Sequence, residues 1–224
     1  EAIAEMCLAH TVGSAVETID EIGRSKGAIS YAGEMDSIEH AIKLGTIICH
    51  PTAMIRIDPL RQAGGYRARF EGAEDCDLWL RLLSYGRLVN LPAPLLHHRL
   101  HAGQVSKRFR ARSSVALFMG RYAAAYRLRH GFDPAIESAS FAIDAVYDCL
   151  KDPPPWAPIG ALRKTARQIG EADRASAREV RRLLWRIGAK ARSSGETLIA
   201  LRALADAATL ALRSRALSAP QSTC

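Results

Sequence analysis

The pattern of this sequence changes near Ser106. Before it, short apolar runs of strand length alternate with amphipathic runs of helix length, which is typical of an α/β domain. After it, four long segments rich in Ala, Arg and Leu predict helices over 108–130, 135–151, 160–192 and 196–217. We therefore expect an α/β domain over residues 1–106 and a helical, basic region over residues 107–224.

The charged residues are also distributed unevenly between the two parts of the chain. Residues 1–104 hold 10 Lys/Arg and 13 Asp/Glu, a balance of −3, and residues 105–224 hold 21 Lys/Arg and 10 Asp/Glu, a balance of +11. A basic half suits nucleic acid or an anionic membrane, or it is a set of arginine-rich helices in solvent. Because the aromatic residues after 106 stand mostly at core-like spacing, we expect no nucleic-acid partner. Peripheral contact with an anionic inner membrane is a hypothesis.

Five cysteines are spread over the chain without a C-x-x-C pair. This spacing argues against a zinc site and against a disulfide framework. It favours a reducing, cytoplasmic location. No apolar run is long enough to predict a membrane span.

The α/β part divides into short predicted elements. Strands are predicted over 11–18, 28–32, 49–57, 88–91 and 95–100, and helices over 35–44 and 74–85, with a short helix after Asp58. The helix over 74–85 is the clearest, because its apolar side chains recur four residues apart and form one buried stripe, Leu78, Trp79, Leu82 and Leu83.

Two acids at the start of this helix attract attention. Asp75 falls on the same inward side as the apolar stripe. Its carboxylate either caps free backbone N–H groups or serves as a general base at the floor of a cleft. Asp77 precedes Arg81 by four residues, which predicts a surface ion pair worth about 0.3–0.5 kcal/mol.

Glycines and a histidine mark two further positions. Gly64-Gly65 suits a turn with positive φ or a backbone that approaches a ligand closely. His50, before Pro51, either bonds to backbone or lines a cleft.

Three clustered histidines, His97, His98 and His101, raise the question of a metal. On an extended chain, His97 and His98 point to opposite faces, and His97 lies about 13 Å from His101. A shared three-histidine site is therefore not expected, although one of them can contribute a single ligand.

The last predicted helix carries an apolar stripe. Its members are Leu198, Leu201, Ala205, Ala208 and Leu212. Their near-helical spacing predicts a face buried in the core or in a helix-packing seam.

Five blocks, in this order, resemble bacterial family 2 glycosyltransferases of the GT-A fold. They are HPTAMIR (50–56), GGYR (64–67), EDCDLWLRL (74–82), GRLVNLP (86–92) and RLHAGQVS (99–106), and VGSAVE (12–17) is similar to the strand after the donor site. The resemblance covers about residues 1–106. It implies a partial, Rossmann-like GT-A domain followed by an α-helical region.

The resemblance also implies roles for single residues. Asp75 would be the catalytic base that deprotonates the acceptor hydroxyl, and Glu74 would support the acceptor site. The implied substrate-binding residues are His50, Gly64, Gly65 and Trp79, with Trp79 packed beneath the site. The implied metal ligand is His101, which would join the metal and the diphosphate.

A departure from the family concerns the donor side. The family's first half carries a nucleotide-binding βαβ region and a D-x-D motif that holds Mg²⁺ or Mn²⁺. The only D-x-D spacing here, Asp75-Cys76-Asp77, falls on the amphipathic helix. We therefore expect that the donor half and its carboxylate ligands are missing, and that this chain alone is inactive.

The function implied is transfer of a sugar, with inversion, from a nucleotide-sugar donor to an acceptor hydroxyl. A glycan or lipid-linked acceptor and a place in surface polysaccharide or glycan biosynthesis fit that activity. The alternative is an inactive remnant or an interaction module without catalysis.

Overall fold

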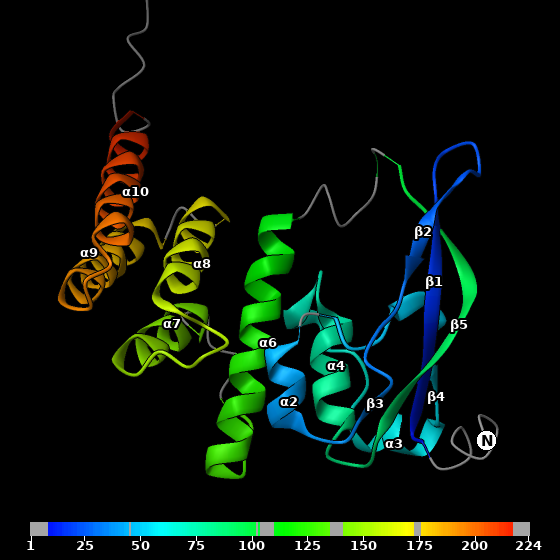
Figure 1. Cartoon of the computed structure of the whole chain (residues 1–224). Helices are drawn as coiled ribbons and strands as arrows, with labels where there is room; N and C mark the ends of the chain where they lie inside the picture. The colour runs from blue at the N-terminus through cyan, green and yellow to red at the C-terminus, as the bar shows by residue number, and fades with distance from the viewer. Residues whose placement is uncertain are drawn as a thin grey trace, which may run out of the picture. The chain divides into compact units, whose positions relative to one another are not determined.

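The computed structural model describes residues 9–44, 46–101, 103, 110–134, 141–172 and 176–216. The chain divides into two compact units, residues 1–134 and 135–224 (Figure 1). The first unit holds a five-stranded mixed sheet with helices, and the second is helical, which confirms the expected α/β class and the helical carboxyl-terminal region. The division falls later than residue 106, because the first long helix packs onto the α/β part.

The sheet is built around β1. Its strands are β1 (Thr11–Ile19), β2 (Ser25–Ile29), β3 (Glu34–Met35), β4 (Met54–Ile55) and β5 (Leu88–Arg99). β5 runs parallel to β1 from Thr11↔Leu88 to Ile19↔Arg99. The other edge of β1 is shared: β4 pairs antiparallel with its start and β2 pairs antiparallel with its end. β3 pairs antiparallel with the start of β5.

β5 joins the two strands predicted around the prolines into one. The register jumps from Ser14↔Leu91 to Ala15↔Pro94 and again to Val16↔Leu96, so extra residues of β5 bulge out of the ladder. Proline lacks a backbone N–H and is tolerated at such irregularities. The bend at the prolines therefore stays within a single strand.

The strand predicted over 49–57 is wrong for most of its length. The segment forms a 3₁₀ turn η1 (His50–Thr52), the two-residue β4, and then helix α3 (Ile57–Gln62). Pro51 stands in the turn, where its missing N–H is not needed. β4 pairs only with Thr11 and Val12 of β1, because the chain before it forms the turn η1, whose Thr52 hydroxyl accepts from the Ser14 N–H in place of a strand.

Helices cover the sheet in two layers. They are α2 (Ile38–Lys43), α4 (Glu74–Leu82) and α6 (Arg110–His130), and a 3₁₀ turn η2 (Ala68–Phe70) precedes α4. In Figure 1, α2 and α4 lie between the sheet and α6, and α6 packs on α2, α4 and η2. The predicted stripe of α4 is buried, with Leu78, Trp79 and Leu82 fully enclosed.

The second unit contains four helices among its described residues: α7 (Phe141–Lys151), α8 (Ile159–Ala172), α9 (Ala177–Ser193) and α10 (Thr197–Ala216). The segment predicted over 160–192 is thus two helices, α8 and α9. Gly170 and Gly188 lie inside them rather than at the break. An added Cβ at Gly170 would lie 3.0 Å from both Val180 and Leu210, so this glycine allows close packing with α9 and α10.

None of the helices in the described ranges is long and apolar enough to cross a membrane.

Candidate functional site

The amino-terminal turn of α4 concentrates acidic groups. Glu74, Asp75 and Asp77 stand in the first turn, where the helix dipole favours negative charge. The Glu74 carboxylate accepts a hydrogen bond from the Gly72 N–H at 2.7 Å, and the Asp75 carboxylate accepts one from the Cys76 N–H at 2.7 Å. The N-cap residue Ala73 has no side chain able to do this, so the two acids satisfy backbone groups near the helix start.

Asp75 is half-buried, and its electrostatics differ from those of a surface acid. Burial raises its pKa, and the neighbouring Glu74 raises it further. The Cys76 N–H and the charge of His50 act in the opposite direction without cancelling the effect of burial. A carboxylate with a raised pKa is a stronger base than an exposed aspartate.

His50 and Tyr66 lie against this turn. The His50 Nε2 and the Tyr66 hydroxyl are 3.0 Å apart and share a hydrogen bond. Asp75 and Glu74 help to raise the pKa of Tyr66, after burial as the larger cause. Both side chains are exposed, with 47% of Tyr66 accessible. The structure thus brings His50, Tyr66, Glu74 and Asp75 together at one accessible place.

Trp79 supports this group from below. It is fully buried, and its ring meets the edge of His50 with centroids 6.1 Å apart. Its Nε1 finds no hydrogen-bond acceptor within the described part of the chain. Trp79 therefore lies beneath the site as packing and offers no surface to a substrate.

The turn η1, which carries His50, is hydrogen-bonded to the sheet. The Thr52 hydroxyl donates to the Cys49 carbonyl at 2.8 Å and accepts from the Ser14 N–H of β1 at 3.0 Å. His50 is therefore held by a turn that is tied to the central strand.

The two glycines form a turn rather than a close contact. Gly64 and Gly65 have φ of 77° and 65°, in the left-handed region that favours glycine, and an added Cβ at either would meet nothing within 4 Å. Arg81 of α4 donates to the carbonyls of Ala63 and Gly65, the latter at 2.7 Å. The turn is thereby fastened to α4, and it places Tyr66 next to the acids.

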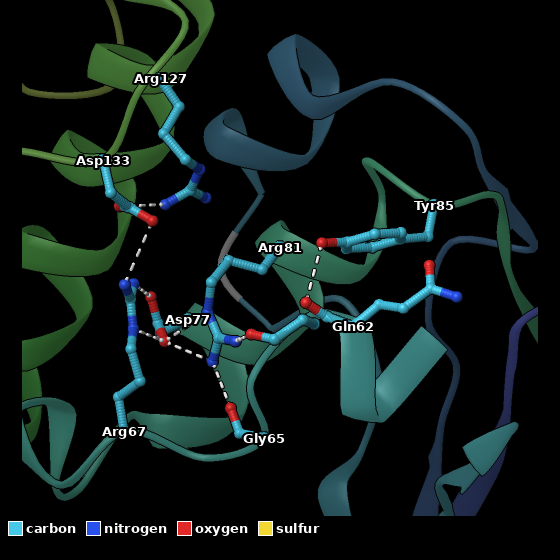
Figure 2. A network of polar contacts seen from close by, with 9 residues as sticks. Gln62, Gly65, Arg67, Asp77, Arg81, Tyr85, Arg127 and Asp133 are labelled. Atoms are coloured by element: carbon cyan, nitrogen blue, oxygen red, sulfur yellow. Dashed lines mark hydrogen bonds and ion pairs between the residues drawn. The ribbon is translucent and has the colours of Figure 1, made fainter. Parts of the chain in front are cut away.

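The sequence predicts a surface position for Asp77, but the structure places this residue in the interior. It is fully buried and receives hydrogen bonds from Arg81 of its own helix and from Arg67 (Figure 2). Arg67 and Arg127 both reach Asp133, at 3.3 and 2.9 Å. The predicted pair of Asp77 and Arg81 exists at 2.8 Å, but as part of a buried network.

α6 explains why Asp77 is covered. Gly120 of α6 lies over Asp77, with its added Cβ position 3.6 Å from the Asp77 Cα and Cβ atoms. A Cβ at this position would make ordinary van der Waals contact with Asp77, so a small residue of α6 covers the acid closely. The spacing within α4 carries no information about that neighbour, which is why the burial was missed.

The histidines after the proline bend lie on another element. His97 and His98 are consecutive residues of β5, opposite Glu17 and Thr18 of β1, and His101 follows the end of that strand with an exposed side chain. Within the described ranges, no three His, Cys, Asp or Glu side chains gather around a common point for a metal ion. The role of His101 as a metal ligand stays a prediction.

Tyr66 is the residue that sequence reasoning missed. It appears in the GGYR block, but no role was attached to it. The signal available was its position directly after a glycine pair that turns the chain, where a side chain is presented to solvent next to the following helix.

Comparisons with known proteins found no match. No protein-family model matches the chain, and no curated protein or solved structure matches it significantly. The likeness to family 2 glycosyltransferases therefore depends on the five sequence blocks alone.

Proposed function

We propose that the cluster at the start of α4 is the acceptor-activating part of an inverting glycosyltransferase site on a partial GT-A-like domain. Asp75 is the general base, Glu74 supports it, and His50 with Tyr66 forms the accessible rim that orients the acceptor. The observation that carries the proposal is the half-buried Asp75 carboxylate with a raised pKa, placed beside an exposed, hydrogen-bonded pair of polar side chains.

The reaction needs one base on this side of the sugar. Asp75 takes the proton of the acceptor hydroxyl as the hydroxyl oxygen forms a bond to the anomeric carbon of the donor. The bond from that carbon to the nucleoside diphosphate breaks, and the diphosphate leaves with the electron pair. Attack from the face opposite the leaving group inverts the anomeric centre, so no covalent enzyme intermediate is required.

Cys76 is unsuited to the alternative of a covalent step. It is buried, and burial raises the pKa of its thiol to about 12, with Asp75 adding to the effect. The thiol therefore stays protonated near neutral pH and is a poor nucleophile.

The competing interpretation is that Asp75 only satisfies the Cys76 N–H at the helix start. The substitution Asp75→Asn separates the two, because an asparagine oxygen still accepts that hydrogen bond but is not a base. The assay uses the complete product of the gene that encodes this chain, with a panel of nucleotide sugars, glycan and lipid-linked acceptors, and Mg²⁺ or Mn²⁺. Release of free nucleoside diphosphate is followed.

We expect one donor and acceptor pair to support release, and Asp75→Asn to lower the rate by about 10²–10⁴-fold, as expected for loss of a general base. Asp58→Asn is the matched control, because Asp58 is an exposed acid on α3. The proposal is wrong if no donor is turned over, or if both variants transfer as fast as the parent protein.

A further inference from the structure

The second unit exposes an unusual face along α9 and α10. We define the α9–α10 face by Arg178, Arg182, Trp185 and Arg186 on α9, and by Leu198, Leu201, Ala205 and Ala208 on α10. All eight residues are exposed. The spacing of four, three and one residues places the α9 members on one side of that helix, opposite the buried Val180, Leu183, Leu184 and Ile187.

The α10 stripe corrects the prediction of a buried seam. Leu198 and Leu201 are each 60% exposed, and α10 instead buries Ala200, Ala203, Ala207 and Leu210. The side chain of Leu212 lies outside the described part of the structure. Large aliphatic side chains in solvent, one turn apart and continued by alanines, mark an interaction surface.

The α9 stripe and the α10 stripe meet at one groove. Trp185 and Ala208 line one groove between α9 and α10, of about 510 Å³. Trp185 also lines a second groove of about 900 Å³ between α9 and α7, together with Tyr147 and Leu150. Trp185 is 61% exposed and, with Arg182, lines both grooves. Ala208 also belongs to the exposed α10 stripe of Leu198, Leu201 and Ala205, so that stripe begins at the groove that Trp185 lines.

The cations of this face have no anionic partner within the chain as described. Arg178, Arg182 and Arg186 make no ion pair with any described carboxylate. Arg186 lies over the ring of Tyr147, 5.3 Å from its centroid. Lys190 adds positive charge at the edge of the larger groove, where Lys151 is already paired with Asp148 at 2.9 Å and Glu179 is the one acid among the lining residues. An anionic partner would supply the missing counter-charges.

We propose that the α9–α10 face docks on an anionic phospholipid membrane. The arginines contact lipid headgroups, the Trp185 indole lies at the interface, and Leu198 and Leu201 enter the boundary with the acyl chains. Exposed aliphatic groups, an amphipathic aromatic and basic side chains on one helical face are the combination that interfacial binding uses. This proposal concerns the second unit alone and does not depend on the sugar-transfer proposal.

Two other partners fit the face less well. A nucleic acid would use the arginines and Trp185 but would leave Leu198 and Leu201 in water. A second copy of this chain, joined by a twofold axis through the face, would bring the same arginines toward each other. A bilayer satisfies the charges and the apolar side chains together.

The test is flotation of the whole chain with vesicles of phosphatidylcholine, with and without phosphatidylserine, at low and high salt. We expect binding only with phosphatidylserine, and loss of binding at high salt. Arg178→Gln/Arg182→Gln should weaken binding about 30-fold, as two surface charges predict. The control Arg24→Gln/Arg129→Gln removes the same charge from exposed positions outside the face and should weaken it at most about threefold.

A second measurement uses tryptophan fluorescence. Brominated lipids should quench the emission of the parent protein, and most of the quenching should be lost in Trp185→Phe, because Trp79 is fully buried and Trp156 is half-buried. Leu198→Ser/Leu201→Ser should lower vesicle binding at least about tenfold while circular dichroism stays unchanged, since both side chains are already in solvent.

Three results would overturn the proposal. The first is a failure to float with phosphatidylserine vesicles at low salt, or a loss of vesicle binding in Arg24→Gln/Arg129→Gln as large as that in Arg178→Gln/Arg182→Gln. The second is binding to single-stranded DNA that is as sensitive to Arg178→Gln/Arg182→Gln as vesicle binding and is stronger. The third is a concentration-dependent dimer that Leu198→Ser/Leu201→Ser abolishes, which would make the face a self-association surface.

Discussion

In the first unit, Arg67, Arg81 and Arg127 reach two carboxylates, Asp77 and Asp133, whereas in the second unit the arginines of the α9–α10 face reach none that the structure describes. The residue type is the same, and the surroundings differ. Around α4 the arginines approach acids from three segments, so they can be withdrawn from water at an acceptable cost in free energy. On α9 they stand in solvent, where a long charged side chain is at no disadvantage.

This comparison shows what an arginine-rich composition leaves open. An arginine stabilises a fold where it meets a buried acid, and it is available to a partner where it does not. The neighbouring residues, and not the arginine itself, make the difference. Each prediction below tests this contrast in one of the two units.

The largest effect is expected at Asp77. Asp77→Asn removes the buried charge that Arg67 and Arg81 share and leaves two guanidinium groups close together. Breaking such a buried pair costs about 3–5 kcal/mol, so we expect that loss in the free energy of unfolding, measured by urea denaturation.

Asp133→Asn is the control for this substitution. Its carboxylate also accepts from two arginines, but 39% of the side chain is exposed. The expected loss is below about 1 kcal/mol. Similar losses of stability at Asp77 and Asp133 would mean that the burial of Asp77 does not make its ion pairs more important than those of the partly exposed Asp133.

A smaller effect of opposite sign is expected at Asp75. Its folded pKa is raised above the ordinary value of 3.8, so the native state binds more protons than the unfolded chain between the two values. Stability therefore falls as the pH rises through this window, and the deficit persists at neutral pH. Asp75→Asn cannot ionise and should be more stable than the parent protein at neutral pH, by less than the loss at Asp77.

The gain at Asp75 should vanish well below pH 3.8, where both states of the parent protein are protonated. Urea unfolding of Asp75→Asn and of Asp58→Asn, at acidic and at neutral pH, measures it. Equal behaviour of the two variants would show that Asp75 carries no penalty from burial.

The smallest effect is expected on α9. Arg182→Gln removes a cation that contacts no carboxylate in the described structure, so the free energy of unfolding should change by no more than about 0.5 kcal/mol. The same urea experiment measures it. A loss of several kcal/mol would mean that α9 uses its arginines for folding, as α4 does, and would remove the contrast between the units.

Short-range patterns predicted much of the fold. The buried stripe of α4, the helices that follow residue 106 and the strand that became β1 were all readable from periodicity, because each depends on residues close in sequence. The strand over 49–57 failed because Pro51 stands in a 3₁₀ turn, whose Thr52 hydroxyl, and not a strand, bonds the Ser14 N–H of β1.

The candidate site was predicted in part. Asp75, Glu74 and His50 were named in advance, and the structure places them together, but Tyr66 entered only because a glycine turn brings it back to α4. Asp77 was assigned to the surface because helical spacing reveals only its partner four residues away. Arg67 and the covering Gly120 reach it from distant parts of the chain.

The sequence by itself determined where most of the chain is helical, which positions of α4 are apolar, and that positive charge gathers in the second half. Only the tertiary structure decided which face of a helix is buried. α10 has two faces that can pack, and the alanine face was chosen, because Ala200 and Ala203 are small enough to let α10 lie close to Gly188 of α9. Leu198 and Leu201 were left in solvent as a result.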